Sequence, residues 1–182
     1  MKVVAVVGSP RVQGNTNFLV QEALKEIAEA GIETETVVVS RQKIGFCLSH
    51  DDCGSVAACY LKDDMQPLMD RFWAADGVVL ASPAYFGNVS GQMKVFIDRN
   101  RFYYRQQKKL AARSAGIITL AATNGMETTR DALRRFLRSV SGLPEEKVHS
   151  VIGYTRPAAA RDSAALIEEA REMGRKMARD LT

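Results

Sequence analysis

Apolar, β-branched runs alternate along the whole chain with segments in which apolar residues recur at helical spacing. The runs predict five strands, at residues 2–7, 33–40, 76–82, 114–122 and 147–154. Continuous runs of Val and Ile are typical of strands buried on both faces of a parallel sheet. The pattern therefore favours an α/β fold whose sheet is covered by helices on both sides.

The segments between and after these runs carry apolar residues at steps of three and four. This spacing predicts helices at about residues 16–30, 63–74, 90–104, 127–140 and 162–180. With right-handed crossovers and five strands, the flavodoxin-like doubly wound order 2-1-3-4-5 is the expected topology. No repeat or linker interrupts the alternation, so we expect residues 1–182 to form a single domain.

Composition adds little to what the pattern predicts about fold and function. The chain has 182 residues, 46% of them hydrophobic, which suffices for one substantial core. Lys and Arg exceed Asp and Glu by 25 to 21, a net charge of +4, which favours anionic ligands without identifying one. The apolar start at residues 2–7 is too short for a membrane span or a signal peptide. We expect a cytoplasmic protein that does not associate with membranes.

The loop after the first predicted strand has the chemistry of an anion site. It reads "GSPRVQGNTN", residues 8–17, and leads into a helix whose first N–H groups and dipole favour a phosphate. The spacing matches neither G-x-G-x-x-G nor the P-loop. A phosphate site and a simple helix cap with turn glycines both remain open for this loop alone. Its candidate ligands are Ser9, Arg11, Asn15, Thr16 and Asn17.

The loop after the third predicted strand is aromatic. In "SPAYFGNVSGQMKVFIDR", residues 82–99, Pro83 and Gly87 sharpen a turn that presents Tyr85 and Phe86 at the same sheet edge as the first loop. Adjacent aromatics alone are more often surface or core filler. Together with a phosphate cradle, they suit a phosphorylated aromatic cofactor lying across the point where the strand order reverses.

At this point the chain resembles a known group, the NADPH-dependent FMN reductases and iron–sulfur flavoproteins of the flavodoxin-like fold. The matching segments are "GSPRVQGNT" (8–16), "DDM" (63–65), "ADGVVLASPAYFGNVSGQMKVFIDR" (75–99) and, more loosely, "TNGMETT" (123–129). The resemblance implies bound FMN and a homodimer or homotetramer. It implies that the phosphate is held by Ser9, Arg11, Asn15, Thr16 and Asn17, and that the ring is edged by Pro83, Ala84, Tyr85, Phe86, Gly87, Thr123, Asn124 and Gly125.

Three cysteines lie within the longest stretch without a predicted element, residues 41–62. An odd number of cysteines this close together does not favour a disulfide framework. Aligned on "DDM" with iron–sulfur flavoproteins, Cys47, Cys53 and Cys59 fall on three of the four cluster positions and His50 falls on the fourth. An iron–sulfur cluster, a zinc site and free thiols all remain open.

The resemblance leads to a functional hypothesis. FMN itself carries hydride and electron chemistry, so no catalytic side chain is expected. The leading interpretation is an FMN-dependent oxidoreductase that takes hydride from NADH or NADPH and passes electrons to a flavin, quinone or metal-centre acceptor. The alternatives are a non-enzymatic electron carrier, with or without an iron–sulfur cluster, and a redox sensor. The donor nucleotide and the acceptor remain open.

Two further segments carry weaker signals. Residues 99–113, "RNRFYYRQQKKLAAR", hold six basic residues, three aromatic ones and no acidic one. Without a nucleic-acid module we expect a solvated connection that binds no nucleic acid, with recognition of the extra phosphate of NADPH as the lesser alternative. Residues 156–165, "RPAAARDSAA", are expected to form a turn and a helix start without chemistry.

Overall fold

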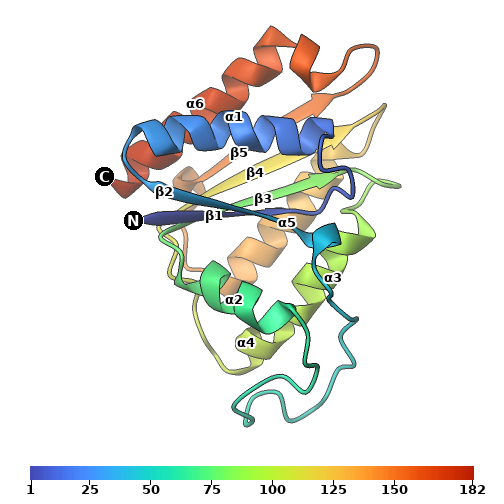
Figure 1. The fold of residues 1–182 in the computed structure, drawn as a ribbon, viewed down its shortest axis with the longest axis vertical. Coiled ribbons are helices and arrows are strands. Elements are labelled where there is room, and N and C mark those ends of the chain that lie inside the picture. The colour runs from blue at the N-terminus through green and yellow to red at the C-terminus, as the bar shows by residue number, and fades with distance from the viewer.

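The structure, a computed structural model, describes residues 1–182 and contains one five-stranded parallel sheet with helices on both faces (Figure 1). The strand order β2-β1-β3-β4-β5 confirms the flavodoxin-like prediction. The strands are β1 (Lys2–Val7), β2 (Glu33–Val38), β3 (Gly77–Pro83), β4 (Ser114–Ala121) and β5 (Val148–Tyr154). The α-helices are α1 (Asn15–Glu29), α2 (Met65–Ala74), α3 (Gly91–Arg99), α4 (Arg101–Arg105), α5 (Met126–Val140) and α6 (Ala164–Leu181). Short 3-10 helices are η1 (Val39–Arg41), η2 (Glu145–Lys147) and η3 (Ala160–Asp162).

The helices form two layers, with α1 and α6 on one face of the sheet and α2, α3, α4 and α5 on the other (Figure 1). Successive side chains of a strand point to opposite faces, and β1 shows this directly. Val4 and Val6 pack under α2 and α3, whereas Val3, Ala5 and Val7 pack under α1 and α6. Strands buried on both sides explain the continuous Val and Ile runs of the sequence.

One helix is predicted at 90–104, but in the structure this segment is divided at Asn100 into α3 and α4. This residue is almost fully buried, and its amide group donates from Nδ2 to the Phe96 carbonyl at 2.8 Å. Its Oδ1 accepts from Trp73 Nε1 at 2.6 Å. The Asn100 side chain thereby ends α3 and joins it to α2. None of the helices is both long and apolar enough to cross a membrane.

Candidate functional site

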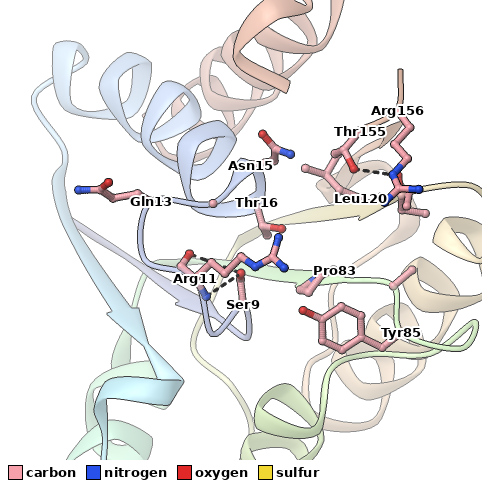
Figure 2. A pocket seen from close by; sticks show the side chains of 14 residues that line it. Ser9, Arg11, Gln13, Asn15, Thr16, Pro83, Tyr85, Leu120, Thr155 and Arg156 are labelled. Carbon is pink, nitrogen blue, oxygen red and sulfur yellow. Dashed lines mark hydrogen bonds between the residues drawn. The ribbon is translucent and has the colours of Figure 1, made fainter. Parts of the chain in front are cut away.

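A cavity of about 700 Å³ opens at the carboxyl ends of β1, β3, β4 and β5 (Figure 2). This is the edge of the sheet where doubly wound folds bind their ligands. The cavity lies between the loop after β1 and the loop after β3, with the ends of β4 and β5 completing the wall. It is lined by Ser9, Arg11, Gln13, Gly14, Asn15, Thr16, Pro83, Ala84, Tyr85, Leu120, Ala121, Ala122, Thr155 and Arg156.

The loop after β1 is held close to α3, and this fixes the floor of the cavity. Ser90 Oγ donates to the Gly8 carbonyl at 2.6 Å and accepts from the N–H of Met93 at 3.2 Å, so Ser90 caps α3 and ties it to the loop. A Cβ atom on Gly8 would lie 2.5 Å from Met93 Cβ. The glycine is therefore required for this close approach.

The first turn of α1 faces the cavity without a cap. Its N-cap residue is Gly14, which has no side chain to accept from the first N–H groups. A simple helix cap, the alternative left open for this loop, is therefore not supported, because no side chain caps the first turn of α1. A helix start whose N–H groups remain free is a favourable position for a phosphate or another anion.

The predicted polar ligands of this loop divide into two groups. Ser9 and Thr16 are buried in the cavity wall, and Arg11 points its guanidinium group toward the cavity (Figure 2) with no carboxylate within 4.0 Å. Asn15 lines the cavity but uses Oδ1 to accept from the Ala160 N–H at 3.1 Å. Asn17 is not part of the wall. Its Nδ2 donates to the Val12 carbonyl at 2.6 Å and braces the loop from behind.

The loop after β3 contributes fewer residues to the wall than expected. Pro83, Ala84 and Tyr85 line the cavity, whereas Phe86 is fully exposed, with φ of +51°. The other expected ring neighbours, Gly87, Thr123, Asn124 and Gly125, also lie outside the wall. Two of these glycines touch each other: a Cβ on Gly125 would lie 2.7 Å from Gly87 Cα. They shape the loops that flank the cavity.

Several wall residues were not predicted from the sequence. Residues 120–122 and Thr155 with Arg156 follow β4 and β5, so the rule that ligands lie at the carboxyl ends of strands was the signal that could have found them. Arg156 belongs to a segment for which no chemistry was expected. It has no carboxylate partner within 4.0 Å, so the cavity contains a second free cation in addition to Arg11.

The cysteine loop does not gather into a metal site. No group of three or more His, Cys, Asp and Glu side chains is placed to hold a metal ion. Arg99 donates to Cys59 Sγ at 3.6 Å, and Arg101 donates to Cys53 Sγ at 3.7 Å. The His50 ring packs edge-on against another ring of the loop. These residues and Cys47 therefore do not fit a cluster or a zinc ion.

Asp63, the first of the two acidic residues in the "DDM" segment, anchors this loop to α3. Burial alone would raise the pKa of Asp63, but its hydrogen bonds from Arg99 and from the N–H groups of Gly45 and Met65 outweigh that cost and lower it. Arg99 Nη1 and Nη2 reach the two carboxylate oxygens at 2.6 and 3.0 Å. Only 1% of the Arg99 side chain is exposed, so the pair is a buried clamp between the loop and α3.

The cavity fits a phosphorylated aromatic cofactor. One end offers an uncapped helix start, buried hydroxyl groups and a free guanidinium, which suit a phosphate. The other end is formed by Pro83, Ala84, Tyr85 and the apolar ends of β4, which suit a flat ring. Fold and site together define the class of flavodoxin-like flavoproteins.

Within that class, the chain belongs to the NADPH-dependent FMN reductase family, which matches residues 1–155. The protein is similar to an iron–sulfur flavoprotein of Methanocaldococcus jannaschii, with 34% identity over 98% of this chain and 96% of the relative. An iron–sulfur flavoprotein of Archaeoglobus fulgidus is 35% identical over 79% of this chain and 66% of the relative. The family assignment confirms the resemblance inferred from the sequence.

Solved structures support the same fold. An NAD(P)H:quinone oxidoreductase from Methanothermobacter marburgensis superimposes with a TM-score of 0.75 at 20% identity, covering 96% of this chain and 94% of the other. A flavodoxin from the domain Archaea superimposes with a TM-score of 0.65 at 12% identity, covering 100% of this chain and 99% of the other. At these identities the comparison establishes the shared fold.

Proposed function

We propose that the protein binds FMN in the cavity at the sheet edge and oxidises NADH or NADPH, passing the electrons to a flavin, quinone or metal-centre acceptor. The observation that carries this proposal is the cavity itself, which joins the uncapped start of α1 and the free Arg11 to an aromatic and apolar wall. Membership of the FMN reductase family supports the cofactor and the reaction class.

The residues of the cavity have distinct tasks in this proposal. Arg11, Ser9 and Thr16 bind the phosphate together with the first N–H groups of α1. Residues 83–85 and 120–122 orient the ring and shield it from water. The neighbouring residues Phe86, Gly87, Thr123, Asn124 and Gly125 border the ring from outside this wall. When bound, FMN supplies the hydride and one-electron chemistry.

Arg156 is a second free cation, at the opposite side of the same cavity, and it can bind the nicotinamide nucleotide (Figure 2). A guanidinium group binds phosphate oxygens through paired, charge-assisted hydrogen bonds. We place the anionic part of the electron donor at Arg156 and the cofactor phosphate at Arg11.

We also propose that the protein forms a homodimer or homotetramer. Phe86 is fully exposed at the rim of the site, and Phe46 and Leu48 in the cysteine loop are 78% and 64% exposed. Contact with a second copy would cover these side chains. Light scattering of the wild type and of Phe86→Ser tests this, and a monomeric wild type contradicts it.

The test of the oxidoreductase proposal uses anaerobic protein saturated with FMN. We expect NADH or NADPH to bleach the flavin absorbance, and a quinone or free FMN to restore it with turnover. Flavin that dithionite reduces but neither nucleotide reduces would favour the electron carrier instead. Protein that binds no FMN would overturn both.

A variant of the phosphate cradle locates the cofactor in the same experiment. Loss of one charge-assisted contact in Arg11→Ala should weaken FMN binding by about tenfold or more. Arg135 is exposed on α5 and has no carboxylate partner, so Arg135→Ala is the matched control and should bind FMN as the wild type does. Equal FMN affinity in the two variants would show that Arg11 does not bind the phosphate.

A further inference from the structure

Two cavities adjoin each other on the face covered by α4 and α5, away from the flavin cavity. Their volumes are about 540 and 400 Å³, and they share Tyr104, Ser139 and Val140. Neither shares a residue with the flavin cavity. Volumes of this size are typical of small-molecule sites.

The rim of this double cavity carries four cations without a counter-charge. Arg101, Arg105, Lys108 and Lys109 each have no carboxylate within 4.0 Å, and no acidic residue occurs between Asp98 and Glu127. Asp98, the one carboxylate in the wall, is bonded to Lys94 at 2.5 Å. Clustered like charges repel each other, and a bound anion would relieve that repulsion.

The backbone holds two of these cations in place. Gln107 has φ of +57°, in the left-handed region that residues other than glycine rarely adopt. The N–H of Lys108 donates to the Tyr103 carbonyl at 3.2 Å, and the N–H of Leu110 donates to the Val140 carbonyl at 2.8 Å. The turn after α4 is thus fixed against the end of α5, with Lys108 and Lys109 at the rim.

An exposed aromatic ring lies among these cations. Tyr104 is 55% exposed and belongs to both cavities. Ile97, Phe136 and Val140 form an apolar floor in the larger one. A ring that is open on one side and flanked by cations is the arrangement on which proteins stack a nucleobase while binding its phosphates.

We propose that the double cavity is a second ligand site that binds a nucleoside phosphate, with the base against Tyr104 and the phosphates between Arg105, Lys108 and Lys109. This site is separate from the oxidoreductase function proposed above and does not depend on it. The observations favour a mononucleotide over a nucleic acid strand because the unpaired cations lie around these two cavities alone. The neighbouring cavity, which shares Ser141, contains Arg134 and Arg138, but both are paired with Glu145.

A ligand bound in this site would also lie against the cysteine loop. Cys47 belongs to the wall of the larger cavity. Arg101 Nη1 donates to the His50 carbonyl at 2.9 Å, and Arg105 Nη2 donates to the Asp51 carbonyl at 3.4 Å. A ligand bound there would cover the Cys47 thiol, which gives the test a readout that does not depend on activity.

The test uses calorimetry on FMN-saturated protein with ADP as the probe, and adenosine and pyrophosphate as its two halves. ADP should bind to this site more tightly than either half. Charge reversal in Lys109→Glu should weaken ADP binding by about tenfold or more, and Tyr104→Leu by about fivefold or more. Lys176 is exposed on α6 and has no carboxylate partner, so Lys176→Glu is the matched control and should leave the affinity unchanged.

Alkylation of Cys47 by iodoacetamide, followed by peptide mass spectrometry, provides the second readout. ADP at about ten times its Kd should slow this alkylation roughly tenfold in the wild type, and should do so far less in Lys109→Glu at the same concentration. No ADP binding, equal weakening in Lys176→Glu, or pyrophosphate binding as tight as that of ADP would overturn the proposal. Tighter binding of a single-stranded oligonucleotide than of ADP would overturn it in favour of nucleic acid.

Discussion

At the scale of single residues, the contact between Gly87 and Gly125 decides how the loops after β3 and β4 meet. Both glycines have positive φ, +71° and +87°, a backbone conformation that residues with a side chain rarely adopt. Thr128 Oγ1 donates to the Gly87 carbonyl at 2.6 Å and lies 3.1 Å from the Gly125 carbonyl, which holds the two turns together. Neither residue lines the cavity, yet both set the position of its aromatic wall.

We predict that Gly125→Ala destabilises the protein and weakens FMN binding. The methyl group would lie 2.7 Å from Gly87 Cα, and positive φ adds about 1 kcal/mol or more of strain. Urea unfolding should show a loss of about 2 kcal/mol, and fluorescence titration a weaker affinity for FMN. Gly142→Ala is the control, because a Cβ there meets nothing within 4 Å and φ is not positive. Equal effects in both variants would contradict the contact.

At the scale of elements, one carboxylate near the end of α6 ties that helix to two strands. Asp180 Oδ1 accepts from Lys147 Nζ at 2.6 Å, and Oδ2 accepts from Ser114 Oγ at 2.8 Å. The same Oδ2 lies 2.7 Å from Nε2 of His149 on β5. Burial alone would raise the pKa of Asp180, but the hydrogen bonds from these three partners outweigh it and lower the pKa.

This arrangement predicts a pH-dependent contribution to stability. Because the pKa of Asp180 is lowered in the folded state, its contribution is complete above the unfolded value of about 3.9 and is lost as the pH falls further. At pH 7, Asp180→Asn should lower the free energy of unfolding by about 2 kcal/mol, and the difference from the wild type should shrink below about pH 4. Asp162→Asn, an exposed control, should change stability by less than about 0.5 kcal/mol. A difference that stays constant with pH would contradict the assignment.

The elements also show what local sequence can and cannot predict. The five strands and their order follow from short-range patterns and general rules of chain connection. The break at Asn100 does not, because it depends on Trp73, which lies 27 residues earlier. The same holds for the cavity wall: Arg11 and Tyr85 could be predicted from their loops, whereas the displacement of Asn17 depends on how its loop folds back onto Val12.

The cysteine loop marks a second limit of prediction from sequence. Spacing relative to "DDM" placed Cys47, His50, Cys53 and Cys59 in one candidate set. In the structure, guanidinium groups from the α3–α4 segment contact the Cys53 and Cys59 sulfur atoms, and no metal-binding group forms. Ligand spacing describes the chain locally, whereas these partners come from about 40 to 50 residues away.

At the scale of the whole molecule, two separate cores meet only through the sheet. One lies under α2, α3, α4 and α5, and the other lies under α1 and α6. The cavity at the sheet edge is built on the carboxyl ends of four strands and on the start of α1, so it takes residues from segments that pack into both cores. A ligand there contacts both layers at once and should stabilise the fold as a unit.

This coupling predicts how two related ligands change the unfolding of the apoprotein. A ligand that binds only the folded state stabilises it by mass action, by about 2.7 kcal/mol at one hundred times its Kd. FMN should therefore raise the melting temperature strongly, whereas riboflavin at the same concentration should raise it much less, because it lacks the phosphate that the start of α1 and Arg11 would hold. Arg11→Ala should reduce the stabilisation by FMN and leave that by riboflavin nearly unchanged. Equal stabilisation of the wild type by the two ligands would mean that the loop after β1 does not bind the phosphate.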